Sequence, residues 1–144
     1  NLQHLDMTGC SLVEADLSHS DLSHANLSGV DLSHANLSHC LLKGAKLDGA
    51  ILNAAFLESA MLDEVSALET QFIGATLIGL NSQQGNFTAA NFSNANGEGI
   101  KFFESTLDRA LLNGANLSHS EFNAVSLNGS HLVGTKLDES TLHK

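Results

Sequence analysis

The segment DLSHANLSGVDLSHANLSHC, residues 21–40, decides the fold because it repeats one five-residue pattern without interruption. A leucine stands at every fifth position from Leu22 to Leu37. The same register continues along the whole chain, from Leu2 to Leu142, and almost every residue in it is Leu, Phe or Met. The exceptions are Ala67, Ser82 and Gly97. No helix or heptad has a period of five, so the pattern excludes amphipathic helices and coiled coils as the organising structure.

Each five-residue unit has the character of a short strand followed by a bend. In the unit ANLSG, Ala25 precedes the large residue Leu27 by two positions, and residues two apart in an extended chain point to the same side. A small and a large apolar side chain therefore point inward, and Asn26 between them points outward. Ser28 and Gly29 favour a bend. A chain that bends every five residues and keeps one side inside coils into a solenoid. The large residue is termed the centre of its unit.

The units ANLSG at residues 25–29 and ANLSH at residues 115–119 resemble those of the pentapeptide repeat family. The resemblance extends over essentially the whole chain. It implies an all-β fold, a right-handed quadrilateral parallel β-helix (solenoid) with four pentapeptides in each coil. On that basis the 144 residues form about seven coils, which at a strand spacing of ~4.8 Å make a rod of roughly 35 Å. The period of five residues by itself leaves a three-sided coil open.

Residues 1–144 are expected to form a single pentapeptide-repeat β-helix domain that belongs to a longer chain. The apolar register is already present at Leu2 and still present at Leu142, and neither end carries a segment typical of a cap. Flanking domains are therefore expected to cover the helix ends, or two chains join end to end. The acidic N-terminal half would repel itself, so such a homodimer is expected to join the C-terminal coils around Leu132, Leu137 and Leu142.

Three centres lack a large side chain, and the residues around two of them favour the four-sided coil. Twenty residues after Ala67 and Ser82 come two phenylalanines, Phe87 and Phe102, whose rings are large enough to fill the space. Unfilled space in a core costs stability, and a three-sided coil offers Ala67 no such compensation. Gly97 has no large partner at this spacing, so a local bulge is expected around it.

The charge and composition exclude several classes of protein. The chain carries 16 Asp and Glu against 6 Lys and Arg, a formal net charge of −10, which excludes direct binding to nucleic-acid phosphates. A hydrophobic content of 42% is too high for a disordered chain, and no apolar run is long enough to span a membrane. Cys10 and Cys40 are expected to point inward on opposite sides without forming a disulfide. A cytoplasmic location, bacterial or in a host cell, is therefore favoured.

Serine–histidine pairs and columns of histidine are the residues that suggest chemistry. Pairs such as Ser18-His19 invite a hydrolase interpretation, but nucleophilic catalysis needs a base within reach and an oxyanion site in a pocket. Their place at the bends explains them as solvated turn residues. His4 and His24, and likewise His19 and His39, would lie one coil apart, where two imidazoles could share a zinc ion without a third ligand from the motif. The sequence therefore predicts no catalytic residue, no cofactor and no enzyme, and leaves metal binding by these columns open.

Apolar residues at outward positions identify a candidate interface. The outward position is usually Asp or Asn, but five apolar residues occupy it, namely Leu41, Ile51, Phe56, Met61 and Leu111. Of these, Leu41 and Met61 are twenty residues apart and would stack on one side of the coil, next to the side that carries Phe56 and Ile78. Contiguous apolar residues on a surface indicate a contact site. The candidate interface is Leu41, Phe56, Met61 and Ile78.

Function is expected on the outer surface, because a filled tube offers no pocket for a ligand. The sequence predicts a non-catalytic protein–protein interaction or scaffold module with an unidentified protein partner, such as the repeat domain of a larger or effector-type protein. The family resemblance also implies an alternative, a DNA-mimicking inhibitor or protector of a type II topoisomerase (gyrase). The net charge of −10 suits this alternative, but the acids of the first coils fall on four different sides. They are Asp6, Asp16, Asp21 and Asp31.

Overall fold

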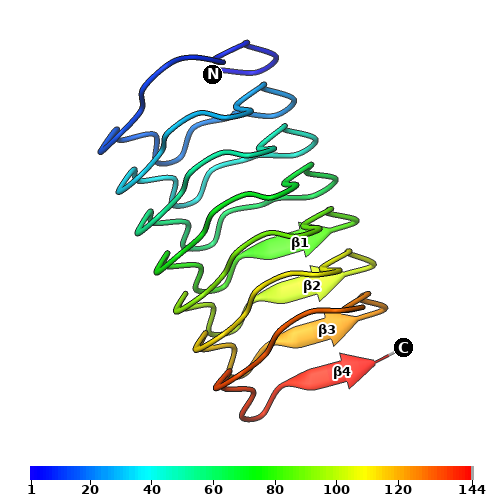
Figure 1. The fold of residues 1–144 in the computed structure, drawn as a ribbon. Helices are drawn as coiled ribbons and strands as arrows, with labels where there is room; N and C mark the ends of the chain where they lie inside the picture. Colours follow the sequence, from blue (N-terminus) through cyan, green and yellow to red (C-terminus); the bar gives the residue numbers. More distant parts are fainter. Residues whose placement is uncertain (144) are drawn as a thin grey trace.

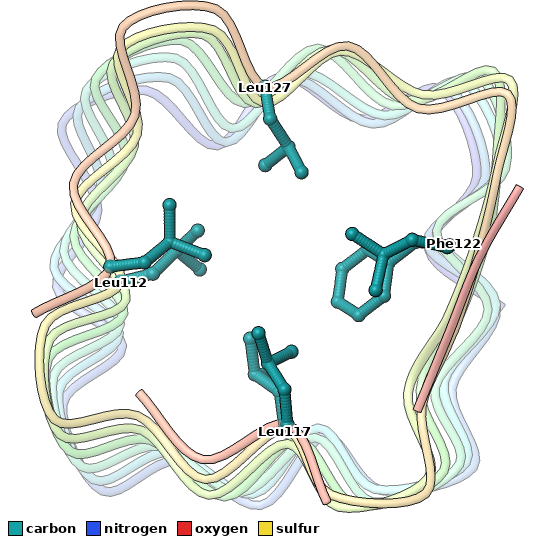
Figure 2. A pocket seen from close by; sticks show the side chains of 7 residues that line it. Leu112, Leu117, Phe122 and Leu127 are labelled. Carbon is teal, nitrogen blue, oxygen red and sulfur yellow. The ribbon is translucent and has the colours of Figure 1, made fainter. Parts of the chain in front are cut away.

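The chain winds into stacked coils with four sides (Figure 1), which appear square when viewed along the axis (Figure 2). The computed structural model describes residues 1–143. Its isolated parallel bridges all join residues twenty positions apart, from Asp6 with Asn26 to Asn116 with Lys136. Four pentapeptides therefore make one coil. This confirms the right-handed quadrilateral parallel β-helix and excludes the three-sided coil. The sides are numbered in chain order: side one carries Leu22, side two Leu27, side three Leu32 and side four Leu37.

Side one contains a parallel sheet in the C-terminal half of the solenoid (Figure 1). Its strands are β1 (Asn81–Gln83), β2 (Lys101–Phe103), β3 (Glu121–Asn123) and β4 (Thr141–His143), paired in the order β1-β2-β3-β4. Other units pair through single bridges, because five residues allow only a short extended segment before the next turn. No helix among residues 1–143 is long and apolar enough to cross a membrane.

Each unit ends in a turn whose second residue has a positive φ. The N–H of Cys10 donates to the carbonyl of Met7 at 3.0 Å, and the corresponding bond recurs in most units. The second turn residue is Gly9 in this unit, with φ of 77°, and His24 in another, with φ of 59°. This is the geometry of a type II turn, which favours glycine. Bonds between coils hold other residues in this conformation, as the 2.8 Å bond from the His24 N–H to the Lys43 carbonyl illustrates.

Aspartate and asparagine are common at the outward position because their side chains bind the N–H of the first turn residue. The Oδ1 atom of Asp31 accepts a hydrogen bond from the Ser33 N–H at 2.9 Å, and Asn26 accepts one from the Ser28 N–H at 3.2 Å. A carboxylate and an amide oxygen both serve as acceptors. The two residue types therefore replace each other at this position from one unit to the next.

Hydrogen bonds from the first turn residue also lower the pKa of the outward carboxyl groups. At Asp31 the Ser33 hydroxyl contributes most and the Ser33 N–H next. Bonds of the same kind lower the pKa of Asp6, Asp16 and Asp21. A carboxyl group whose pKa is lower in the folded state contributes its full stability above the unfolded-state pKa of about 4 and loses it as the pH falls through the lowered value. The free energy of unfolding, measured by urea titration, is therefore expected to fall as the pH drops below about 4.

A variant in which Asp6, Asp16, Asp21 and Asp31 are all replaced by Asn is the matched control for this acid dependence. Its amide oxygens still accept the turn N–H groups but do not titrate, so the fold is expected to persist and the loss of stability in acid to become shallower. An equally steep loss in the variant would contradict the assignment of the acid dependence to these carboxyl groups.

The interior is filled by the centres and by the small residues that precede them by two positions. Most of these small residues are apolar, and polar ones from Thr70 onward donate hydrogen bonds to carbonyls of the preceding coil. The Thr70 hydroxyl donates to the Leu47 carbonyl at 2.7 Å, and the Ser120 hydroxyl to the Gly97 carbonyl at 3.1 Å. A hydroxyl can therefore lie inside the tube without the cost of an unsatisfied polar group.

Both cysteines are free thiols in the structure. Cys40 is buried, which raises the pKa of its thiol, and its Sγ lies 2.9 Å from the carbonyl oxygen of Leu17. Cys10, which was also expected to point inward, is exposed in the first coil.

Phenylalanine rings fill the space beside the small centres Ala67 and Ser82. Phe87 and Phe102 are buried and meet edge-on, with ring centroids 5.2 Å apart. The Ser82 hydroxyl donates to the Leu62 carbonyl at 2.9 Å, so this polar centre is satisfied as well. Ser82 pairs with Phe102 in the sheet, and Ser66 before Ala67 bridges to Asn86 before Phe87, so each ring lies in the coil after the small centre.

The local bulge predicted around Gly97 is wrong. The Gly97 N–H donates to the Asn116 carbonyl at 2.8 Å, and the Ile100 N–H donates to the Gly97 carbonyl at 3.1 Å, as in a regular unit. A Cβ atom added at Gly97 would lie 2.9 Å from Cδ2 of Leu117 and 3.7 Å from Cδ1 of Ile100. These two side chains occupy the space. Ile100 stands at a small position, so a comparison of centres alone does not reveal it.

Candidate interaction surface

All four residues of the candidate interface are exposed on the middle coils. The exposed fractions are 42% for Leu41, 47% for Phe56, 40% for Met61 and 36% for Ile78. Three further large apolar residues of the same coils are exposed, namely Ile51, Leu68 and Ile73. In the preceding coil the outward positions are polar: Asp21, Asn26, Asp31 and Asn36. Apolar residues at outward positions therefore begin with Leu41, in the coil that follows residues 21–40.

The four side chains lie around the corner at which side four meets side one. Leu41 and Met61 are neighbours on side one, where a parallel bridge joins them. Phe56 lies on side four, bridged to residues of the coils before and after it. Ile78 belongs to side four of the next coil and is the first turn residue of its unit, so it lies toward the corner. Leu41, Phe56, Met61 and Ile78 together are termed the corner surface.

The five-residue pattern does not identify Leu68 and Ile73, although both are exposed. They stand at the first turn position, for which the pattern predicts only polar, bend-forming residues. The N–H of Leu68 donates to Oδ1 of Asp48 at 2.9 Å and that of Ile73 to Oδ1 of Asn53 at 3.1 Å, so the acceptors come from the preceding coil. An aliphatic residue can therefore replace the usual serine. That replacement is the signal in the sequence that could have identified both residues.

Carboxylates surround the corner surface. Glu58 and Glu98 stand twenty residues before and after Ile78 on side four, and both are exposed. On side one, Nζ of Lys43 lies 3.1 Å from Oε1 of Glu64, with both side chains about half exposed. The rim is thus mainly acidic, and its lysine is already paired with a carboxylate.

The histidine columns stack instead of converging on a metal position. The rings of His4 and His24 are 5.1 Å apart at an interplanar angle of 9°, and those of His19 and His39 are 4.8 Å apart at 11°. Two nitrogens that share a zinc ion lie within about 4.2 Å of each other, twice the zinc–nitrogen distance. Stacked rings instead direct their nitrogens alongside each other. Residues 1–143 contain no cluster of three or more His, Cys, Asp or Glu side chains that could hold a metal ion.

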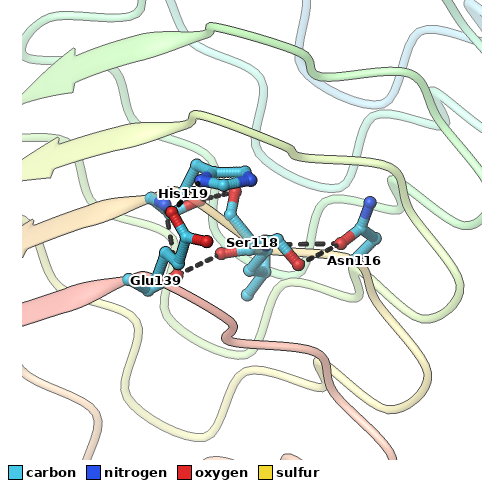
Figure 3. A network of polar contacts seen from close by, with 7 residues as sticks. Asn116, Ser118, His119 and Glu139 are labelled. Carbon is cyan, nitrogen blue, oxygen red and sulfur yellow. Dashed lines mark hydrogen bonds and ion pairs between the residues drawn. The ribbon is translucent and has the colours of Figure 1, made fainter.

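The serine of the Ser118-His119 pair is directed away from the histidine (Figure 3). The Ser118 hydroxyl donates to Oδ1 of Asn116 at 2.8 Å, whereas Nδ1 of His119 lies 3.3 Å from Oε2 of Glu139. An activated serine would donate to its base. This hydroxyl instead stabilises the turn of its own unit.

Core side chains are exposed at the last described coil. Figure 2 shows Leu112, Leu117, Phe122 and Leu127 pointing toward the axis around an opening, and Leu132, Leu137 and Leu142 line the same opening. Leu142 is 56% exposed, and Val133 on the outer face is 78% exposed. This opening is lined by apolar side chains alone and offers no polar group that would orient a ligand.

Comparison with protein families finds one match, the model described as pentapeptide repeats, in 8 copies. The matched segments are residues 1–38, 40–79, 86–118 and 105–143. No curated protein sequence matches the chain.

Among solved structures, the chain is similar to QnrB1, a plasmid-mediated fluoroquinolone resistance protein. A trypsin-treated variant of QnrB1 matches with a TM-score of 0.68 and 21% identity over 96% of this chain and 82% of that chain. Full-length QnrB1 matches with a TM-score of 0.57 and 16% identity over 96% and 91% of the two chains. HetL, a pentapeptide repeat protein of the cyanobacterium Nostoc, matches with a TM-score of 0.39 and 24% identity over 97% and 88%. At these identities the likeness to QnrB1 concerns the fold.

Proposed function

Because the chain belongs to the pentapeptide repeat family, we propose that it is a non-catalytic interaction module that binds a protein partner through the corner surface. The exposure of four large apolar side chains around one corner is the observation that supports this proposal most directly. Apolar residues that gather on a surface are characteristic of contact sites, and repeat solenoids present extended surfaces to partners. Residues 1–144 serve in this proposal as one domain, a scaffold or recognition arm.

Two features support a role without catalysis. Between Leu22 and Phe122 the tube is filled by buried side chains, nearly all of them apolar, so this part of the interior has no room for a substrate. The serine of the Ser118-His119 pair donates to a turn acceptor and not to the histidine, which leaves it without the activation that a nucleophile needs.

Replacing both Leu41 and Met61 with Asp is expected to leave the fold intact and to abolish partner binding. Both side chains point outward, so the circular dichroism spectrum is expected to stay nearly unchanged, with a change in stability of about 1 kcal/mol or less. A photoreactive amino acid at position 56, introduced in cells that produce the protein, is expected to yield a discrete crosslinked product. The double variant is expected to lose this product.

The matched control carries the photoreactive residue at Asn86, an exposed outward position on side two, and is expected to yield no such product. Unfolding of the double variant would place Leu41 and Met61 in the core and contradict the assignment of their direction. Absence of a product from position 56, or a product that persists in the double variant, would overturn the proposed interface.

A second candidate function is binding to a type II topoisomerase as a mimic of DNA. The fold likeness to the fluoroquinolone resistance protein QnrB1 and the net charge of −10 favour it. The acids of the first coils argue against it, because they lie on four different sides and accept hydrogen bonds from turn N–H groups. They are Asp6, Asp16, Asp21 and Asp31.

Supercoiling assays with DNA gyrase, with and without a fluoroquinolone, separate the two candidates. An interaction module that uses the corner surface is expected neither to inhibit supercoiling nor to protect the enzyme from the drug at low micromolar concentration. Inhibition or protection in that range would rank the topoisomerase mimic above the interaction module.

A structure that covers the apolar side chains of the last described coil is still only predicted. A flanking domain or a second chain joined end to end would bury Leu132, Leu137 and Leu142. Either arrangement leaves the corner surface free, because that surface lies on the middle coils.

A further inference from the structure

Ile78 lies between two carboxylates in a single column on side four. The carbonyls of Ile78 and Glu98 accept hydrogen bonds from the N–H groups of Ser59 and Gly79, at 2.9 Å and 3.0 Å. These bonds align Glu58, Ile78 and Glu98 along the axis of the solenoid, one residue per coil. An apolar side chain is thereby flanked on both sides by acidic ones.

The carboxylates of Glu58 and Glu98 are available to a partner. Neither side chain forms an ion pair or a hydrogen bond within residues 1–143, and both are exposed. The acids on side one differ, since Asp21 accepts a bond from the Ser23 N–H at 3.0 Å and Asp63 one from Gln83 at 2.9 Å. The Asp residues therefore have a role within the solenoid, whereas the two glutamates next to Ile78 have none there.

We infer that the corner surface binds a basic amphipathic segment of a partner protein, with apolar side chains against Phe56 and Ile78 and Lys or Arg side chains against Glu58 and Glu98. This inference rests on the proposed function and specifies the chemistry of its partner. Interfaces place opposite charges around an apolar centre, and an amphipathic helix presents both on one face. A second copy of this chain fits poorly, because two acidic rims would meet.

Fluorescence anisotropy with a labelled amphipathic helical peptide built only from Leu and Lys tests this inference. The peptide is expected to bind saturably, more weakly at high salt, and a peptide with Glu in place of every Lys is expected not to bind. The variant Glu58→Gln with Glu98→Gln is expected to weaken binding about three- to tenfold, the scale of two exposed ion pairs. Ile78→Asn is expected to weaken it about tenfold.

Matched controls remove the same charge or the same side chain elsewhere. Glu14→Gln with Glu69→Gln neutralises two exposed glutamates at other corners, and Ile73→Asn removes an exposed isoleucine on side three. Both controls are expected to change the affinity by less than about twofold. Equal losses from the control and test variants would show that the peptide responds to net charge alone, and the inference would be wrong.

The crosslinking experiment separates failure of this inference from failure of the proposed function. A crosslinked product from position 56 that persists at full yield in the Glu58→Gln, Glu98→Gln variant would overturn the basic partner and leave the interface standing. Absence of any product from position 56 would overturn the interface itself. A product lost in this variant and kept in the Glu14→Gln, Glu69→Gln control supports both.

Discussion

Leu27→Asp is expected to unfold the protein. The Leu27 side chain is 0% exposed and belongs to the continuous apolar core. The adjacent centres Leu22 and Leu32, and Leu47 twenty residues later, are buried leucines that cannot pair with an ionised carboxylate, and burying such a group unpaired costs several kcal/mol. A loss of that size is comparable to the whole stability of a small domain, about 5–15 kcal/mol. Circular dichroism and urea titration are expected to show an unfolded chain, or one destabilised by more than about 4 kcal/mol.

Asn26→Asp, one residue earlier, is the matched control. Asn26 points outward and its Oδ1 atom accepts the Ser28 N–H, a bond that a carboxylate forms equally well. The neighbours twenty residues away are Asp6 on one side and Lys46 on the other, so repulsion and attraction largely offset each other. The expected cost is below about 1 kcal/mol. Comparable losses from both substitutions would refute the inside–outside assignment of the five-residue unit.

In this fold the alternation of side chains within a unit and the stacking of coils place the same residues inside. The register from Leu2 to Leu142 therefore predicts the inward direction of each centre. A side chain next to a centre points the opposite way, so the candidate interface could be predicted as exposed. The register does not predict the number of sides in a coil, because a period of five residues fits either three or four sides. Only pairs twenty residues apart in which a large centre follows a small one, Ala67 with Phe87 and Ser82 with Phe102, distinguish these possibilities.

Contacts that cross between columns could not be predicted from the register. Ile100, from the small position of the next unit, shares the space at Gly97 with Leu117, and Thr70 donates to the Leu47 carbonyl, 23 residues earlier in the chain. Such contacts depend on the lateral offset between coils, which the sequence period does not contain. Leu68 was missed for the same reason, since its turn N–H finds its acceptor in the preceding coil.

The hydrogen bonds also change how the acidic residues are interpreted. The total of 16 acidic residues suggested a surface that resembles DNA in charge. Several of these, such as Asp16 and Asp31, are acceptors for turn N–H groups, a role that Asn36 fills equally well. Glu58 and Glu98 have no such role. In the proposed interface these two carboxylates face the partner, and a net charge does not single them out.

Phe102→Ala is expected to be the most damaging of the aromatic-to-alanine substitutions in the core. Phe102 is 1% exposed, and its ring centroid lies 5.2 Å from that of Phe87 and 5.8 Å from that of Phe122. Truncation leaves a cavity beside Ser82, a centre too small to fill it. Strands β1, β2 and β3 hold the surrounding backbone in register, so the site cannot collapse. The expected loss is about 3–5 kcal/mol in the free energy of unfolding, measured by urea titration.

Phe103→Ala is the adjacent control, because Phe103 points away from the core and is only partly buried. Its backbone carbonyl accepts the Gln84 N–H at 2.8 Å, and alanine preserves that bond. The expected loss is about 1 kcal/mol, the scale of a surface residue with some buried area. The difference in the free energy of unfolding between the two variants then measures the contribution of the Phe102 ring, which lies over Ser82 of the preceding coil. Equal losses from the two substitutions would show that the Phe102 ring does not fill space left by Ser82. The argument that a large centre compensates for a small one in the preceding coil would then fail.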